Sequence, residues 1–328
     1  MKQILNYLFQ HQTLSKAEAK AIFKDISLGK FNDTEVTAFI TVFLMRQITL
    51  DEMLGFRDAL LELVTPLNLG NDLLDIVGTG GDNKNTFNIS TLAAFVIAGA
   101  GQKVAKQGNY AASSVSGSST VLESLGYQFK TNEDDLKNDL EKSNFCFIHA
   151  PLFHPSLKHV APMRKELGLR TFFNLLGPLV NPAQPKYNVI GVCNSEISRL
   201  YQYIIQKDNR ETAIVHGLDG YDEISLTADT KIILNNTERV YSPHQLSSKS
   251  VKPNDIFGGN SPEEAKSIFE SIINGNGTKE QNAVVITNAA IGLLTTNKFG
   301  DYKNCYEIAE ESLLGLKAKQ SLESLIHN

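Results

Sequence analysis

The hydrophobic pattern of this chain changes its period near residue 70, and this change limits the folds open to it. Up to about residue 65, apolar residues recur at intervals of three and four, which is typical of amphipathic helices. Beyond residue 72, short apolar runs typical of strands alternate with helical segments. Such alternation predicts the α/β class, with a central, mostly parallel sheet flanked by helices.

Strands are expected at 73–77, 103–105, 145–149, 187–192 and 213–216, with two short ones between 230 and 242. Helices are expected at 19–26, 36–45, 53–64, 90–98, 118–125, 134–143, 196–207, 262–274, 279–295 and 302–318. Capping boxes mark three of the early helix starts, at Ser15 with Glu18, Thr49 with Glu52 and, more weakly, Asn32 with Glu35.

Pro, Gly and Asn between residues 65 and 72 mark a boundary between two domains. We expect a small all-helical N-terminal domain at 1–67 and a large α/β domain at 68–328. Residues 155–178 interrupt the alternation of strands and helices and are mainly helical in pattern. They are therefore expected to form a helical insertion that joins the N-terminal helices.

Composition excludes several classes of protein. The formal net charge is −5 and no basic stripe is visible, which argues against a nucleic-acid surface. Three scattered cysteines form neither a disulfide framework nor a zinc motif, so a reducing, cytoplasmic location is expected. The longest apolar stretch, 92–100, is far shorter than the roughly 20 residues that cross a membrane, and the N-terminus does not read as a secretory signal.

A glycine-rich turn, GTGGD at Gly78–Asp82, links an expected strand to an expected helix. Its glycines allow a tight turn and close approach of a ligand, and the free N–H groups of the helix start favour a phosphate. Ser90 and Thr91 add hydroxyl groups. Considered by itself, this segment is explained equally well by a tight turn with a helix cap.

A second polar loop, KQGNYAASSVSGSS at Lys106–Ser119, also follows an expected strand. A lysine with several small hydroxyl residues suits a pyrophosphate, although a solvated loop is the more common meaning of such a segment. Two such loops at adjacent strand ends would line one crevice, and that favours a phosphate site.

Asp222 and Glu223 form an acidic doublet just after another expected strand. Magnesium prefers a few carboxylate oxygens completed by substrate phosphates, so the doublet suits a magnesium site. Without the two phosphate loops, a solvated acidic loop would be the better interpretation. His149, His154 and His159 are spaced by five residues. On a helix, neighbouring side chains of this set would point about 140° apart, which argues against a shared metal site.

Together these segments resemble the anthranilate phosphoribosyltransferases over nearly the whole chain. The matching stretches are DIVGTGGD, FNIST, KQGN, SSVSGS, VLESLG, RKELGLRTFFNLLGPLVNP and VHGLDGYDEISL. The resemblance implies a small helical domain beside a large α/β domain, a homodimer formed through the helical part, and Mg²⁺ as cofactor. It also implies transfer of a phosphoribosyl group to anthranilate in tryptophan biosynthesis, with no nucleic acid or membrane as partner.

Residue by residue, the resemblance implies four overlapping groups of site residues. Catalysis would involve Lys106, Asp222 and Glu223, and magnesium would be held by Ser90, Asp222 and Glu223. Anthranilate would contact Gly78, Asn109 and Arg164, whose planar guanidinium suits a planar carboxylate. Phosphoribosyl pyrophosphate would contact Gly78, Gly81, Asp82, Thr86, Asn88, Ile89, Ser90, Thr91, Lys106, Gln107, Gly108, Asn109, Tyr110, Ala111, Ala112, Ser113, Ser114 and Ser118.

The chain departs from the family pattern in the second loop. Gln107 and Tyr110 stand where the family usually has His and Arg, and Ser119-Thr120 often reads Ala-Asp. An amide does not exchange protons at neutral pH, so no acid–base role is expected at residue 107.

Two other functions stay open from the sequence. The pyrimidine nucleoside phosphorylases share this architecture but lack the RTxFNxLGPLxNP type of segment that is present here. Some relatives of the fold bind nucleic acid without the expected activity, which the acidic charge and the complete acidic doublet disfavour.

Overall fold

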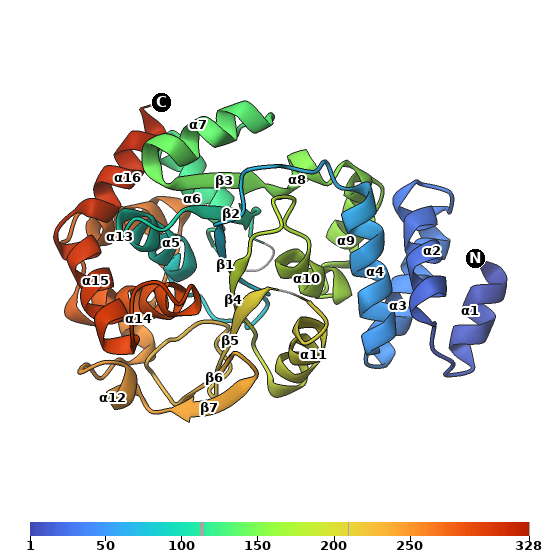
Figure 1. Ribbon diagram of the computed structural model, residues 1–328. Helices are drawn as coiled ribbons and strands as arrows, with labels where there is room; N and C mark the ends of the chain where they lie inside the picture. The colour runs from blue at the N-terminus through green and yellow to red at the C-terminus, as the bar shows by residue number, and fades with distance from the viewer. Residues whose placement is uncertain (112–114, 209, 328) are drawn as a thin grey trace. The chain divides into compact units, whose positions relative to one another are not determined.

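The computed structural model describes residues 1–111, 115–208 and 210–327, and it divides into two compact units. A helical unit comprises residues 1–67 and 150–184, and a sheet unit comprises residues 68–149 and 185–328. Each unit is therefore built from two separate stretches of the chain, as the colours of Figure 1 make visible.

The sheet unit contains seven strands in the order β3-β2-β1-β4-β5-β6-β7. Neighbours from β3 to β5 run parallel, whereas β6 and β7 are antiparallel. This mostly parallel sheet confirms the predicted fold class. The strands are β1 (Leu74–Gly78), β2 (Val104–Gly108), β3 (Phe145–His149), β4 (Tyr187–Gly191), β5 (Glu211–Gly217), β6 (Thr230–Leu234) and β7 (Thr237–Tyr241).

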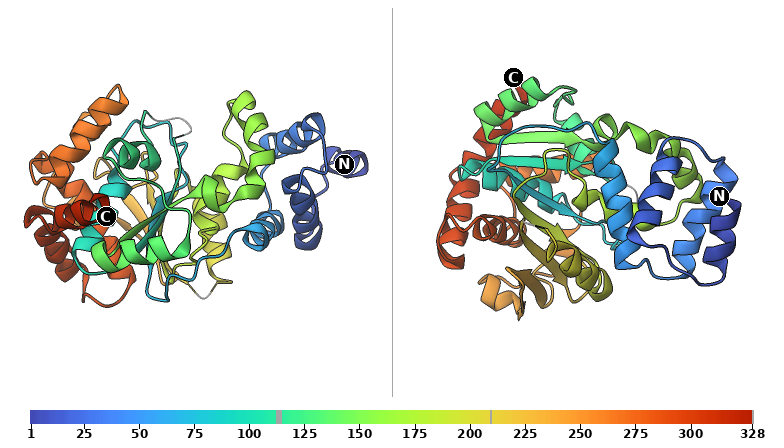
Figure 2. Two further views of the ribbon diagram at one scale, coloured as in Figure 1. Left: turned by 90° about the horizontal axis from the view of Figure 1, so that it is seen from above. Right: turned by 45° about the vertical axis from the view of Figure 1, so that its right-hand side comes forward.

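Helices cover the sheet, because strands this apolar need burial on both faces. Figures 1 and 2 place α11 on the side of β5 opposite to α14. The helices are α5 (Ile89–Gly99), α6 (Ser118–Ser124), α7 (Glu133–Ser143), α11 (Ser195–Ile205), α12 (Pro243–Leu246), α13 (Pro262–Ile273), α14 (Lys279–Thr295), α15 (Tyr302–Leu314) and α16 (Lys317–Ile326), with a 3₁₀ turn, η3, at Pro253–Ile256.

The C-terminal part corrects one prediction. Residues 302–318 were expected to form a single helix, but α15 ends at Leu314 and α16 begins at Lys317. Leu316 breaks the helix with a left-handed φ of 64°. Ser312 of α15 donates to the carbonyl of Val96 on α5, at 2.7 Å, and α16, after the break, packs on the same helix.

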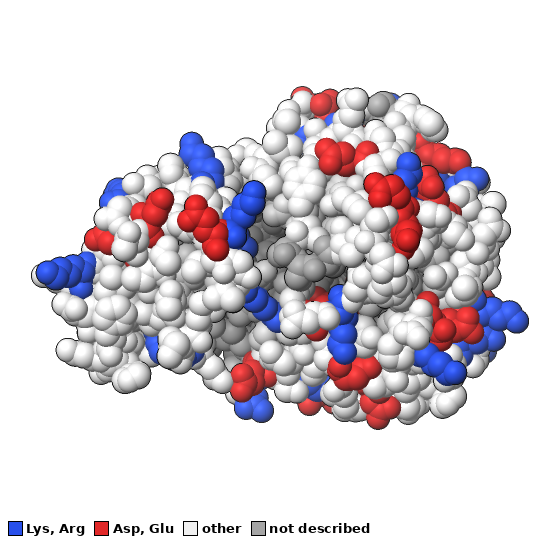
Figure 3. Space-filling view, turned by 180° about the vertical axis from the view of Figure 1, so that it is seen from behind, with Lys and Arg blue, Asp and Glu red and all other residues white. Residues whose placement is uncertain are grey.

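The surface carries charges of both signs. On the face drawn in Figure 3, Lys and Arg side chains are interspersed with Asp and Glu. Such a mixture offers no continuous basic stripe for a phosphate backbone on this face. No helix in the described part of the chain combines the length and the apolar character needed to cross a membrane.

The helical unit begins with four helices and is completed by a later segment of the chain. The three predicted capping boxes are confirmed at the starts of α2, α3 and α4. The elements are α1 (Lys2–Phe9), α2 (Lys16–Ser27), α3 (Asp33–Met45), α4 (Leu50–Leu63), α8 (Ala150–Phe153), η1 (Pro155–His159), α9 (Ala161–Leu167), α10 (Phe172–Leu176) and η2 (Gly177–Leu179). The short helix α1 was not predicted.

A cluster of phenylalanine rings joins the two stretches of the helical unit. Phe172 of α10 lies 4.8 Å from Phe56 and 5.1 Å from Phe43, measured between ring centroids. Phe173 lies 5.4 Å from Phe23 of α2. Aromatic pairs at these separations stabilise a core beyond simple burial. The cluster therefore explains why residues 150–184 pack with the N-terminal helices.

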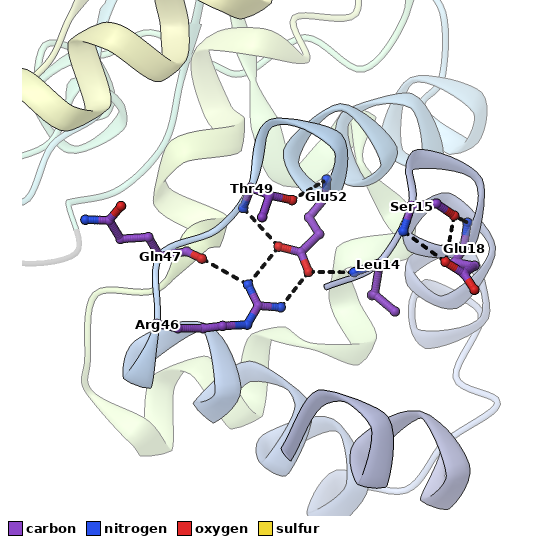
Figure 4. Close-up of polar contacts among 7 residues, drawn as sticks. All are labelled: Leu14, Ser15, Glu18, Arg46, Gln47, Thr49 and Glu52. Carbon is purple, nitrogen blue, oxygen red and sulfur yellow. Dashed lines mark hydrogen bonds and ion pairs between the residues drawn. The ribbon is translucent and has the colours of Figure 1, made fainter. Parts of the chain in front are cut away.

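A buried carboxylate connects the N-terminal helices, as Figure 4 shows. Glu52 is fully buried and accepts hydrogen bonds from the N–H groups of Leu14 and Thr49. The Arg46 guanidinium contacts both of its oxygens, at 2.5 and 2.9 Å. Burial alone would raise the pKa of Glu52, but Arg46 and the two N–H groups outweigh it and lower that pKa.

We predict that Glu52→Gln lowers the free energy of unfolding by about 3 kcal/mol, because it leaves the partly buried Arg46 charge without its partner and neutralises a fully buried acceptor. A lowered carboxyl pKa contributes stability above the unfolded pKa, and this contribution is lost as the pH falls through the folded pKa. Urea unfolding at pH 7 and below would measure both effects. Glu18→Gln, in the exposed capping box of α2, is the control and should change stability little; equal effects would contradict the prediction.

Candidate active site

The predicted phosphate loops lie at the ends of β1 and β2, two neighbouring strands at the centre of the sheet. The second loop was predicted to begin at Lys106, but β2 continues to Gly108, so Lys106 and Gln107 belong to the strand. β1 lies between β2 and β4, so the strand order reverses its direction beside β1. In open parallel sheets, ligands bind outside the carboxyl ends of the strands at such a reversal. The segments after β1, β2 and β5 all leave from those carboxyl ends.

The segment after β1 turns at once through left-handed backbone. Gly80 and Gly81 have φ values of 65° and 72°, which residues with a Cβ rarely adopt. The turn lets the Gly80 N–H donate to Oδ2 of Asp222 at 2.7 Å. The glycine-rich turn and the acidic doublet, predicted to converge, therefore lie in direct contact.

Asp222 fits into a space that glycine leaves free at two strand ends. A Cβ added to Gly78 of β1 would collide with the Asp222 carboxylate, and one added to Gly191 of β4 would collide with the Asp222 carbonyl. Asp222 is 9% exposed. Its position thus depends on the absence of side chains at the ends of β1 and β4.

Glu223 lies at the start of α5. Its Oε1 accepts from the Ser90 N–H at 3.0 Å, and its Oε2 accepts from the Thr86 hydroxyl at 3.4 Å. The positive end of the helix dipole favours an anion at this place. Glu223 as a whole residue is half-buried.

Three acids crowd the site. Burial, followed by repulsion from Asp222 and Asp82, raises the pKa of Glu223 to about 8, against the opposing effect of the Ser90 N–H and Lys106. Burial also raises the pKa of Asp82. Both shifts indicate a local excess of negative charge, which favours binding of a cation.

Lys106 supplies a buried cation beside these acids. It is 2% exposed in β2, and its ammonium donates to the carbonyl of Ile76 and, at 3.4 Å, to the Ser90 hydroxyl. Burial lowers its pKa, whereas the charges of Asp75 and Glu223 oppose that shift. The ammonium group therefore connects β1, β2 and α5 and interacts with the charge of Glu223.

The segment after β2 also reaches this site. The Asn88 side chain donates to the carbonyl of Ser116 at 3.0 Å, instead of capping α5. The carbonyl of Asn109 accepts from the Ser119 N–H at 3.2 Å and from the Ser118 hydroxyl at 3.4 Å. Both predicted loops and the acidic doublet thus lie together. Three of the predicted residues, Ala112, Ser113 and Ser114, lie outside the described residues.

The predicted phosphoribosyl pyrophosphate residues differ in what they can present to a ligand. Ile89 and Thr91 are buried in the core, and Gln107 is 6% exposed, so their side chains do not face an open site. The Gln107 N–H is directed to Asp75, at 3.3 Å. Gly81, Asp82, Asn109, Tyr110 and Ala111 all lie on the segments after β1 and β2.

Arg164 belongs to the helical unit, in α9, whereas the other described site residues belong to the sheet unit. Its guanidinium lies over the Phe173 ring, 4.8 Å from the centroid. Burial lowers the pKa of Arg164, and no carboxylate among the described residues offsets that shift. A half-buried guanidinium whose charge is disfavoured by desolvation is suited to an anionic ligand.

The sequence analysis missed Asn288 of α14. Its side-chain oxygen accepts from the Ile224 N–H at 3.1 Å, and its side-chain nitrogen donates to the Ile224 carbonyl at 2.9 Å. It therefore fixes the residue that follows Glu223. A polar residue inside the apolar run AVVITNAAIGLL was the available signal.

Comparisons with known proteins agree with this geometry. Residues 70–318 match the family described as "Glycosyl transferase family, a/b domain", and residues 2–64 match its "helical bundle domain". The anthranilate phosphoribosyltransferase of Flavobacterium psychrophilum is 48% identical over 326 residues, covering 99% of this chain and 98% of the relative. That of Bacteroides fragilis is 49% identical over 327 residues, covering 99% of each chain.

Solved structures give the same result. The anthranilate phosphoribosyltransferase of Thermus thermophilus superposes with a TM-score of 0.91 at 31% identity, covering 98% of both chains. That of Saccharomyces cerevisiae, in complex with PRPP and Mg, superposes with a TM-score of 0.90 at 27% identity, covering 98% of this chain and 96% of the other.

We predict that the raised pKa of Glu223 makes the metal-free protein less stable as the pH rises. The folded protein keeps a proton on Glu223 up to a pKa of about 8, whereas the ordinary value is 4.5. Between these values the folded state binds the extra proton, so the free energy of unfolding falls with increasing pH and levels off above about 8.

Glu223→Gln should flatten that slope and raise the melting temperature at pH 8. Thermal unfolding in a chelator, from pH 5 to 9, would measure it. Glu238→Gln, on the exposed face of β7, is the control. Parallel pH profiles for the wild type and Glu223→Gln would contradict the prediction.

Proposed function

The chain belongs to the anthranilate phosphoribosyltransferases, and from this we propose that it transfers the phosphoribosyl group of phosphoribosyl pyrophosphate to the amine of anthranilate. The products are N-(5-phosphoribosyl)anthranilate and pyrophosphate, in a step of tryptophan biosynthesis. The convergence of two polar loops and an acidic doublet at the central strand ends is the observation that carries this proposal.

Magnesium fits the residues at these strand ends. Mg²⁺ favours one or two carboxylates completed by substrate phosphates and water, rather than a cage made of protein alone. The described residues contain no group of three His, Cys, Asp or Glu side chains arranged as such a cage. We propose that Ser90, Asp222 and Glu223 hold Mg²⁺, which supplies positive charge to a diphosphate when bound.

The phosphoribosyl pyrophosphate site would use the backbone of both loops. Glycine turns expose N–H groups, and Lys106 places an ammonium beside Ser90 at the start of α5. Such donors stabilise the charge that grows on the leaving pyrophosphate. We assign to this site Gly78, Gly81, Asp82, Thr86, Asn88, Ile89, Ser90, Thr91, Lys106, Gln107, Gly108, Asn109, Tyr110, Ala111 and Ser118, together with Ala112, Ser113 and Ser114 from outside the described residues.

Anthranilate recognition would rest on Arg164 for the carboxylate, and on Asn109 and Gly78. The aromatic amine is a weak base, so it needs placement near the anomeric carbon more than it needs deprotonation. This agrees with Gln107, whose amide cannot act as a general base. Catalysis would then depend on departure of pyrophosphate, aided by Lys106, Asp222 and Glu223.

The helical unit (1–67 and 150–184) would serve as a helical domain, and the sheet unit (68–149 and 185–328) as the phosphoribosyl pyrophosphate-binding domain. We further propose that the protein is a homodimer formed through the helical unit. A hollow of about 730 Å³ lies among α1, α3 and α9, and it is bordered by Phe9 and Met45, which are 59% and 84% exposed. Exposed apolar surface of this kind favours an interface.

A cytoplasmic location is also proposed. All three cysteines are free thiols, and Cys146 and Cys305 are buried. Free thiols persist in a reducing compartment.

The function is tested by mixing the protein with anthranilate, phosphoribosyl pyrophosphate and Mg²⁺ and following the loss of anthranilate fluorescence. Turnover that stops when any one component is omitted would support the proposal. Release of a free base from thymidine or uridine with phosphate would instead indicate a nucleoside phosphorylase. A salt-dependent shift of DNA without turnover would indicate a nucleic-acid-binding relative.

Replacing both Asp222 and Glu223 by Ala should abolish magnesium-dependent turnover, because it removes both carboxylates of the proposed Mg²⁺ site. Initial rates across a magnesium titration provide the measurement. Glu238→Ala, an exposed acid on β7, should behave like the wild type. Turnover near the wild-type rate in the double variant would reject the metal role.

Arg164→Ala should raise the KM for anthranilate about 10- to 100-fold, the usual effect of losing a charge-assisted hydrogen bond, while the KM for the sugar changes much less. Steady-state kinetics with each substrate varied in turn would show it. Lys165→Ala, at the exposed neighbouring position of α9, is the matched control. Equal weakening of both substrates would exclude the assignment.

Met45→Glu should convert the dimer to a monomer, because it places a charge on the exposed apolar surface of α3. Sedimentation equilibrium would give the mass of each species. Leu28→Glu, at an exposed apolar position outside the hollow, should leave the dimer intact. A wild-type mass equal to that of one chain would disprove the proposed dimer.

A further inference from the structure

A second polar cluster lies beside the candidate active site, at the carboxyl ends of β2 and β3. It comprises His149, Ser119, Phe129 and Tyr110, all in the sheet unit. His149 is the last residue of β3 and is paired in register with Gly108, the last residue of β2. No step of the proposed reaction uses His149.

The cluster is centred on a buried hydrogen bond. Nδ1 of His149 lies 2.9 Å from the Ser119 hydroxyl, and these residues are 6% and 0% exposed. Burial lowers the pKa of His149, which favours the neutral ring, and a neutral ring can accept the Ser119 proton at Nδ1. Two buried polar groups that satisfy each other are costly to separate.

Two aromatic rings pack against the imidazole. His149 stacks on Phe129 with centroids 4.2 Å apart and planes inclined by 7°. Tyr110 meets the imidazole edge-on at 5.1 Å, and the Tyr110 hydroxyl lies 3.4 Å from Glu123 of α6.

Ser119 connects the cluster to the segment after β2. Its N–H donates to the carbonyl of Asn109 at 3.2 Å, while its hydroxyl holds His149. Ser118, its neighbour, donates to the same carbonyl at 3.4 Å. A shift of Ser119 would therefore move Asn109 and Ser118, both of which are proposed ligand contacts.

We propose that His149 and Ser119 form a positioning pair that sets the place of Asn109 and Ser118 and thereby the affinity for phosphoribosyl pyrophosphate. This inference rests on the proposed function of the neighbouring loops. His149 acts through Ser119 and does not touch the reacting atoms, so it is a positioning residue. A packing role alone would need the ring of His149 but not its nitrogen.

Two substitutions separate the ring from the nitrogen. His149→Phe keeps an aromatic ring against Phe129 but removes the acceptor. His149→Asn keeps a polar atom near the place of Nδ1 but removes the ring. Titration calorimetry of phosphoribosyl pyrophosphate with Mg²⁺, together with thermal unfolding, gives the affinity and the stability of each folded variant.

The proposal expects a Kd about tenfold weaker for His149→Phe and for Ser119→Ala, the usual effect of one buried hydrogen bond. The double variant should be no weaker than either single variant, because both remove the same bond. His149→Asn should recover the wild-type Kd within about threefold, although it melts at a lower temperature. Ser124→Ala, an exposed hydroxyl on the same helix, is the control.

A wild-type Kd in His149→Phe, or an equally weak Kd in His149→Asn, would overturn the positioning role. Binding is measured without anthranilate, so the result does not depend on turnover. A wild type that binds the sugar phosphate and consumes no anthranilate would count against the proposed function and leave the positioning pair standing.

Discussion

The site depends on a single close approach, between the Asp222 segment and the ends of β1 and β4. Gly78 and Gly191 leave no room for a side chain there, and the Gly80 N–H holds the carboxylate at 2.7 Å. This contact brings the segment after β5 onto the segment after β1, although the two are separated by more than a hundred residues. Glu223, Ser90 and Lys106 take their places around it.

Negative charge at this centre is left partly uncompensated by the protein. Lys106 is a buried cation whose charge opposes the shift, yet the pKa of Glu223 rises to about 8 beside Asp222 and Asp82. An arrangement of this kind binds cations readily and then has the charge needed to accept a diphosphate, which agrees with the proposed chemistry.

Local patterns predicted the parts of the structure that depend on neighbouring residues. The capping boxes, the glycine turn and the alternation of strands and helices all express contacts within a few residues, and they were correct. The split between α15 and α16 was missed because Leu316 is not a residue type typical of a left-handed turn. Asn288 and the His149–Ser119 pair were missed because their partners lie 64 and 30 residues away.

The discontinuous helical unit constrains how the chain matures during synthesis. Its phenylalanine core needs Phe172 and Phe173, which leave the ribosome more than a hundred residues after α4. The first four helices therefore cannot complete their core, and their apolar faces stay exposed, while the strands up to β3 are translated. Such non-local closure is slow and open to aggregation. The period before Phe172 and Phe173 are translated is therefore the stage at which this protein most needs protection by chaperones.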